Sequence, residues 1–263
     1  MIKIKRALIS LSDKTAMEDL VKTLNEFGAE ILSTGGTAQK IKELGIPVKD
    51  VSEYTGFPEM MNGRVKTLHP KIHGGLLALR ENPSHLEQAR EHNIEMIDMV
   101  VVNLYPFEKT IAKEGVTQEE AIENIDIGGP SMLRSAAKNH RSVAVITNPQ
   151  RYPDIIRELK ANNGSLSETT CRDLAVEVFR RTAEYDSVIY NYLNQQTSRP
   201  ADQQTSRLFP DKLTLNFAKV QDLRYGENPH QKAAFYKDPE AKESGICSAR
   251  QIQGKELSFN NII

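Results

Sequence analysis

Three short segments of the sequence combine hydroxyl groups, glycines and basic side chains in the way that phosphate sites do. Ser12-Asp13-Lys14 puts a hydroxyl and an ammonium where a helix is expected to begin, and free backbone N–H groups there favour an anion. In Thr34-Gly35-Gly36-Thr37 the glycines let the backbone approach a phosphate, and the hydroxyls can donate. The third segment, residues 62–70 (NGRVKTLHP), offers Arg64, Lys66 and Thr67.

Each segment also has a simpler interpretation. Ser12 or Asp13 can be an ordinary helix N-cap, and a tight turn between strand and helix favours the same residues as TGGT. Arg64 and Lys66 can belong to a solvated basic loop. The agreement among the segments therefore carries more weight than any one of them.

A further group of residues is suited to moving protons. Tyr105 follows a strand-like run, Asp126 precedes a Gly-Gly-Pro turn that is expected to start a helix, and that helix runs to about Lys138. Asp126 can instead be a turn or cap residue, and Lys138 can offset the helix dipole. Taken together with Lys66, these groups suggest a proton-transfer site beside a place for an anionic substrate.

The sequence suggests no metal centre. His69 and His73 are four residues apart but have no third ligand nearby, so we expect them to be structural. Cys171 and Cys247 are the only cysteines and lack metal spacing. Such sparse cysteine usage favours a reducing cytoplasm.

The elements that position these groups alternate between strand and helix. Apolar runs predict strands at residues 7–9, 30–33, 99–102 and 143–146, and helical spacing predicts helices at 17–27 and 38–44. This order is typical of an α/β fold with a mostly parallel sheet, which binds ligands at the carboxyl ends of its strands.

The second half of the chain indicates a domain boundary. Thr117 with Glu120 and Ser165 with Glu168 have capping-box spacing, and an apolar stripe predicts a long helix ending near Asn194. We therefore place a first domain at 1–195, a polar linker at 196–208 and a second, incomplete domain at 209–263. The last of these has so few apolar residues that we do not expect it to fold alone.

Overall composition argues against two classes of partner. Lys and Arg total 34 against 35 Asp and Glu, so nothing in the balance favours nucleic acid or an anionic membrane surface. No apolar run approaches the roughly 20 residues that span a bilayer, and the N-terminus lacks a signal-peptide pattern. We expect a soluble protein.

The motifs, in order, resemble those of the bifunctional purine biosynthesis proteins, which join an IMP cyclohydrolase domain to an AICAR formyltransferase domain. Six motifs carry the resemblance, namely SDK (12–14), STGGT (33–37), TGFPEM (55–60), NGRVKTLHP (62–70), NLYPF (103–107) and IDIGGPSMLRSAAKNH (125–140). The resemblance implies a three-layer fold like that of methylglyoxal synthase.

The resemblance also implies a reaction, the dehydrative closure of 5-formamidoimidazole-4-carboxamide ribonucleotide (FAICAR) to IMP, without metal or nucleotide cofactor. It places the 5′-phosphate among Ser12, Lys14, Thr34, Gly35, Gly36, Thr37, Arg64, Val65, Lys66 and Thr67. It places the base near Val102, Asn103, Tyr105, Asp126 and Ile127. Lys138 matches the family's acid/base lysine, Asp126 would orient or deprotonate the carboxamide, and Lys66 and Tyr105 would handle protons at the oxygen.

For the end of the chain, the resemblance implies the opening of a formyltransferase domain. Arg224 and Tyr225 match positions that contact the aminoimidazole nucleotide. The sequence ends before the family's lysine-histidine pair and its site for 10-formyltetrahydrofolate, so we expect no formyl transfer from this chain. The intact family proteins are homodimers.

Two other functions remain open. A methylglyoxal-synthase-like lyase would explain the SDK and TGGT turns but leaves the NGRVKTLHP and IDIGGPSMLRSAAKNH motifs unused. A nucleotide-sensing module without catalysis would need the phosphate turns but not Lys66, Tyr105, Asp126 and Lys138 together.

Overall fold

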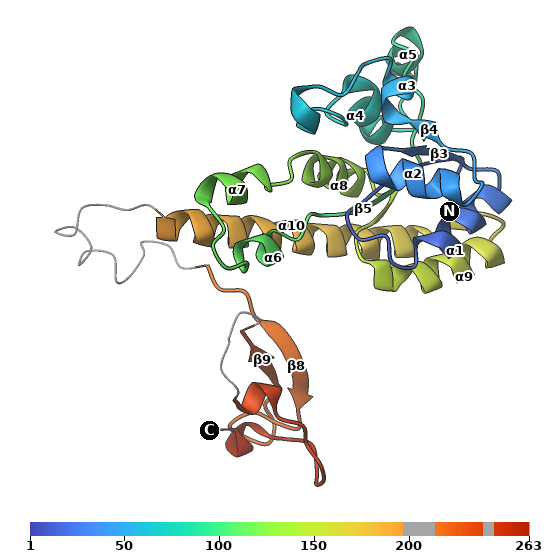
Figure 1. Ribbon diagram of the computed structural model, residues 1–263. Coiled ribbons are helices and arrows are strands. Elements are labelled where there is room, and N and C mark those ends of the chain that lie inside the picture. Colours follow the sequence, from blue (N-terminus) through green and yellow to red (C-terminus); the bar gives the residue numbers. More distant parts are fainter. Residues whose placement is uncertain (197–213, 239–244, 263) are drawn as a thin grey trace. The chain divides into compact units, whose positions relative to one another are not determined.

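The computed structural model describes residues 1–196, 214–238 and 245–262 and divides the chain into two compact units, Met1–Thr197 and Ser198–Ile263 (Figure 1). The predicted linker, apart from Gln196, lies outside the described residues. The first unit contains every candidate site residue except Arg224 and Tyr225.

A parallel sheet forms the centre of the first unit. Its spatial order is β4-β3-β2-β5-β6, and every pair of neighbours is parallel. The strands are β2 (Arg6–Leu11), β3 (Glu30–Ser33), β4 (Lys49–Asp50), β5 (Met99–Asn103) and β6 (Ala144–Ile146). The short strands β1 (Ile2–Lys3) and β7 (Ser165–Leu166) form a separate antiparallel pair.

Helices cover both faces of this sheet (Figure 1). Those of the first unit are α1 (Met17–Glu26), α2 (Gly35–Glu43), α3 (Val51–Thr55), α4 (Pro70–Leu77), α5 (Pro83–Glu91), α6 (Phe107–Ile111), α7 (Gln118–Glu123), α8 (Gly128–Lys138), α9 (Tyr152–Ala161) and α10 (Glu168–Gln196), with 3-10 turns at Met61–Gly63 and Pro149–Arg151. Among the described residues, none of the helices has the length and apolar character needed to cross a membrane.

Alternating side chains of the strands build two separate cores. Ile9 and Val101 face a core that contains α1 and α9, whereas Leu8 and Val100 face a core that contains α4 and α8. The long helix α10 contributes to both, with its first turns in the former core and its middle in the latter. The predicted three-layer α/β fold is therefore confirmed.

Two helix starts differ from the sequence-based expectation. Helix α2 begins at Gly35 rather than at residue 38, with Thr34 as its N-cap, so the TGGT turn is itself the first turn of the helix. Neither Ser12 nor Asp13 caps α1, because the N-cap residue is Ala16 and the Asp13 carboxylate accepts from the Thr15 N–H instead.

The predicted cap at Ser165 is wrong. Ser165 lies in β7 and pairs with Lys3, and the hydroxyl of Ser167 accepts from the Thr170 N–H at 3.1 Å where α10 begins. The strand pairing competes with capping for the backbone of Ser165, and Ser167 is the residue nearest the free N–H groups of the helix. The predicted cap at Thr117 is confirmed by its 3.1 Å bond from the Glu120 N–H.

The second unit has little apolar interior in its described part. Strands β8 (Ala218–Leu223) and β9 (Ala233–Lys237) form an antiparallel pair, and 3-10 turns follow at Ile246–Ser248 and Phe259–Asn261. None of its described residues is among the buried hydrophobic side chains of the chain.

The cap assignment leads to a stability prediction. We expect Ser167→Ala to lower the free energy of unfolding by about 1 kcal/mol, because a Thr170 N–H at the helix start loses its acceptor. Ser165→Ala is the matched control and is expected to have a smaller effect. Urea denaturation followed by circular dichroism measures both, and equal losses would contradict the assignment.

Candidate active site

The first turn of α2 lies beneath two ammonium groups at the carboxyl edge of the sheet. A Cβ built on Gly36 would lie 3.8 Å from Lys14 Nζ, and one built on Gly35 would lie 4.0 Å from Lys66 Nζ. Gly35 has a φ of +48°, which L-residues with side chains rarely adopt. Free N–H groups of a helix start and two cations therefore meet at one point, which is suited to a phosphate.

Ser12, predicted to bind the phosphate, and Asn103, predicted to lie near the base, are hydrogen-bonded to each other. The Ser12 hydroxyl donates to Asn103 Oδ1 at 2.8 Å, and Asn103 Nδ2 donates to the Asp13 carbonyl at 2.8 Å. These bonds fasten the turn after β2 to the turn after β5. A substrate would have to replace them to use either side chain directly.

The two threonines of the TGGT turn differ in what they offer. Thr37 is buried, and its hydroxyl donates to the Leu11 carbonyl and accepts from the Leu11 N–H. Its side chain therefore joins α2 to β2 and is not free to bind a ligand. Thr34 is half-buried and its hydroxyl lies 3.3 Å from that of Ser10 at the end of β2.

The basic loop carries two cations that are paired with carboxylates. Lys66 Nζ lies 3.0 Å from Glu59 Oε1, and the Arg64 guanidinium binds both carboxylate oxygens of Glu123. A bridge between Met60 and Val65 closes the loop and sets Glu59 beside Lys66. Both ion pairs are exposed enough to exchange for a phosphate. Glu59 and Glu123 were not predicted from the sequence.

Asp126 is held at the start of α8 by backbone groups. Its Oδ1 accepts from the Gly129 N–H at 2.9 Å, and the Tyr105 N–H also hydrogen-bonds the carboxylate. A Cβ on Gly129 would lie 2.3 Å from Oδ2, so only glycine fits beneath this carboxylate. Burial raises the pKa of Asp126, and these N–H bonds oppose the rise. A carboxylate with a raised pKa is suited to exchanging a proton.

The basic loop reaches the start of α8 through Thr67. A Cβ on Gly128 would lie 2.7 Å from Thr67 Oγ1, so the loop that carries Lys66 packs against the turn that carries Asp126. Val102 is buried at the end of β5, whereas Tyr105 and Ile127 are 58% and 57% exposed. The backbone N–H of Asp126 donates to the hydroxyl of Tyr185.

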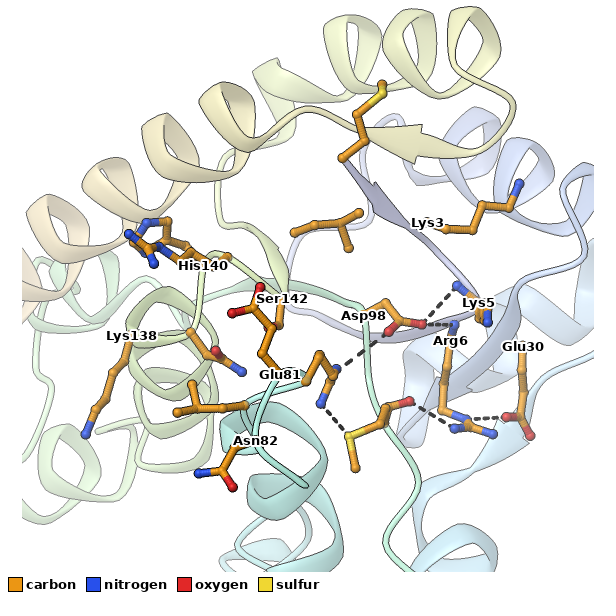
Figure 2. A pocket seen from close by; sticks show the side chains of 17 residues that line it. Lys3, Lys5, Arg6, Glu30, Glu81, Asn82, Asp98, Lys138, His140 and Ser142 are labelled. Carbon is orange, nitrogen blue, oxygen red and sulfur yellow. Dashed lines mark hydrogen bonds and ion pairs between the residues drawn. The ribbon is translucent and has the colours of Figure 1, made fainter. Parts of the chain in front are cut away.

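Lys138 lies apart from the other predicted catalytic residues. It is exposed in the last turn of α8, whose 11 residues separate it from Asp126 by about 16 Å along the helix. It lines a cleft of 910 Å³ at the edge where the strands begin. Figure 2 shows Lys138 around this cleft with Lys5, Arg6 and Asp98. Within one chain, the geometry does not bring Lys138 to the site formed by Lys66, Tyr105 and Asp126.

The two histidines are engaged in local structure. His69 Nδ1 accepts from the Lys71 N–H at the start of α4, and His73 Nδ1 lies 3.0 Å from the Ser135 hydroxyl. Burial lowers the pKa of both. Within the described ranges, no group of three or more His, Cys, Asp or Glu residues is arranged to hold a metal ion.

Comparisons with known proteins agree with this architecture. A family model described as MGS-like domain matches residues 16–131, and one described as AICARFT/IMPCHase bienzyme matches residues 136–263. The bifunctional purine biosynthesis protein PurH of Magnetococcus marinus is 58% identical over 265 aligned positions, which cover 100% of this chain. The chain belongs to the AICARFT/IMPCHase bienzyme family.

Only part of that bienzyme is represented here. The alignment covers 49% of the Magnetococcus protein, so the chain spans about half the length of this curated relative. The crystal structure of ForH matches with a TM-score of 0.68 and 32% identity, over 74% of this chain and 99% of that chain.

The bienzyme family's second-domain motif lies in the second unit. The Arg224 guanidinium stacks on the ring of Tyr225, with 5.4 Å from its carbon to the ring centroid. The Arg224 N–H donates to the Leu257 carbonyl, and the Tyr225 carbonyl accepts from the Phe259 N–H. The roles implied for Arg224 and Tyr225 stay predictions.

The pairing of Lys66 leads to a binding prediction. Because Glu59 competes with an incoming anion for this ammonium, we expect Glu59→Gln to tighten the binding of inorganic phosphate roughly two- to fivefold. Glu53→Gln, on the exposed side of neighbouring α3, is the control and should change nothing. Isothermal titration calorimetry gives the Kd values, and weaker binding by Glu59→Gln would show that Glu59 instead supports Lys66.

Proposed function

We propose that the first unit is an IMP cyclohydrolase that closes the second purine ring of FAICAR. The observation that carries this proposal is that two features lie side by side. One is a phosphate cradle, formed by the Gly35-Gly36 turn with Lys14 and Lys66, and the other is the carboxylate of Asp126. The contact between Thr67 and Gly128 joins them. A sensing module would need only the cradle. The family membership supports the same substrate class, a small ribonucleotide.

In this proposal the cradle holds the 5′-phosphate. The start of α2 supplies N–H groups from the Gly35-Gly36 turn, and Lys14 and Lys66 supply positive charge. Arg64 joins them after it leaves Glu123. Thr34 and Thr67 offer hydroxyls, and Ser12 does so once its bond to Asn103 is exchanged. Thr37 and Val65 would contribute backbone only.

The base then extends over the turn of Asp126 and Tyr105. Ring closure requires the carboxamide nitrogen to lose a proton as it attacks the formyl carbon, and the resulting hydroxyl to leave as water. We assign the first step to the Asp126 carboxylate, whose pKa is raised by burial. Tyr105, whose side chain is exposed beside it, donates to the developing oxyanion and the leaving hydroxyl, while Lys66 stays on the phosphate. The N–H groups of Ile127 and Gly128, at the start of α8, add to this stabilisation.

Several further properties are part of the proposal. The reaction balances without a metal or organic cofactor, so none is proposed for this unit. 10-formyltetrahydrofolate is proposed only for the formyltransferase half of the family, to which Arg224 and Tyr225 would belong. A cytoplasmic location and a homodimeric complete protein are proposed from the family alone.

A spectrophotometric assay tests the proposed activity. The purified chain is mixed with FAICAR in the absence of folate, and the ultraviolet change on IMP formation is followed. Saturable turnover is expected. A folded chain that binds IMP but does not turn FAICAR over would instead identify a nucleotide sensor, and turnover of a triose phosphate would identify a lyase.

The raised pKa of Asp126 leads to a pH prediction. The ionised carboxylate is the active form, so kcat/KM should fall as the pH falls through the pKa of Asp126. Because burial raises this pKa, the acid limb should lie above the ordinary aspartate value of about 3.9. A pH–rate profile measures the limb. If the residual activity of Asp126→Asn showed the same fall of kcat/KM at low pH, that fall would belong to another group.

Because Lys138 lies far from the cradle, substitutions of Lys138 and Lys66 should affect turnover and IMP binding differently. The family resemblance alone gives Lys138 an acid/base role, and on that ground we expect Lys138→Ala to abolish turnover. The Kd for IMP should stay unchanged, because the residue lies at the far end of α8. Lys66→Ala, by contrast, should weaken IMP binding. Full turnover by Lys138→Ala would remove Lys138 from the catalytic set.

A further inference from the structure

Tyr185 is a buried residue of α10 whose hydroxyl reaches the catalytic turn. Its side chain is 1% exposed, and its Oη accepts from the backbone N–H of Asp126 at 2.8 Å. The two residues are 59 positions apart in the sequence. From spacing alone Tyr185 is one more member of an apolar stripe, and nothing in its sequence context marks a contact with Asp126.

The neighbours of Tyr185 connect it to the Tyr105 loop as well. Phe107 packs edge-on against its ring at 6.3 Å between centroids, and the Arg181 guanidinium lies over the ring at 5.9 Å. Arg181 also binds Glu108 of α6 at 2.8 Å. Since α6 begins two residues after Tyr105, one segment of α10 contacts both chain segments that carry the proposed acid and base groups.

Packing alone does not explain why residue 185 is a tyrosine rather than a phenylalanine. A phenylalanine would fill the same space, and a buried hydroxyl is unfavourable unless it is hydrogen-bonded. Burial raises the pKa of Tyr185, so the hydroxyl stays neutral and suited to accept from an N–H. The Asp126 N–H is its hydrogen-bond partner among the described residues.

Asp126 is thereby anchored at both ends. Gly129 and Tyr105 donate N–H groups to its carboxylate, and Tyr185 accepts from its own N–H. Loss of the Tyr185 bond would free the backbone of the turn while the carboxylate kept its other partners. A shift of that carboxylate by a fraction of an ångström is enough to impair a proton transfer without affecting a phosphate bound at α2.

We propose that Tyr185 is a positioning residue for ring closure, and that its hydroxyl fixes the turn from which Asp126 acts on the carboxamide. This inference rests on the proposed cyclohydrolase function. It adds a residue from α10, outside the turns at the edge of the sheet, to the machinery of the site.

A pair of tyrosines provides the test. Tyr192 also packs edge-on against Phe107, at 5.7 Å, and no hydrogen bond of its hydroxyl is found among the described residues. We expect Tyr185→Phe to lower kcat about 10- to 100-fold and to leave KM and the Kd for IMP within about twofold. Tyr192→Phe should leave all three unchanged. A merely structural role for the hydroxyl would affect stability and leave kcat of the folded enzyme as it was.

A double-mutant cycle identifies the residue through which Tyr185 acts. In the Asp126→Asn background, Tyr185→Phe should lower kcat by far less than in the wild type, because the group that it positions is already disabled. Equal effects in both backgrounds would overturn the proposal, as would an unchanged kcat in Tyr185→Phe. If Tyr185→Phe does not fold, Tyr185→difluorotyrosine keeps the ring and weakens the acceptor, and an unchanged kcat there also overturns it. Failure of the wild type to convert FAICAR would instead refute the proposed function.

Discussion

All five strands of the central sheet run parallel, and this places the turns that follow them at one edge. The turns after β2, β3 and β5 contain Lys14, the TGGT segment and Tyr105. Backbone N–H groups at the start of α2 can then act on the same anion as an ammonium from a different loop. Neither the cradle nor the acid/base turn would form if one of these strands were reversed.

Carboxylates and an amide side chain contact the polar groups of the candidate phosphate site. Glu59 and Glu123 engage Lys66 and Arg64, and Asn103 engages Ser12. Exposed ion pairs of this kind are worth little and exchange readily. The Asp126 turn is different, because buried N–H bonds and the Tyr185 hydroxyl fix it. The proposed chemistry thus combines exchangeable contacts for the phosphate with fixed ones for the proton transfer.

The sequence predicts the sheet and the anion-binding turns because both depend on local patterns, namely apolar runs and glycines with hydroxyls. It fails where contacts join distant segments. No local pattern indicates the bond from Asp126 to Tyr185, or the hydrogen bonds between the Thr37 hydroxyl and the backbone of Leu11, 26 positions away. The separation of Lys138 from Asp126 follows from the predicted helix between them, since a helix of that length puts its ends far apart. Its catalytic role comes only from the family resemblance.

In the proposed complex, the cradle at α2 and the turn at Asp126 bind opposite ends of one ribonucleotide. A crystal structure of this chain with IMP tests it most directly. We expect the 5′-phosphate on the Gly35-Gly36 turn between Lys14 and Lys66, with the purine beside Asp126 and Tyr105. A nucleotide bound elsewhere, for example in the cleft of 910 Å³ at the opposite edge of the sheet, would contradict it.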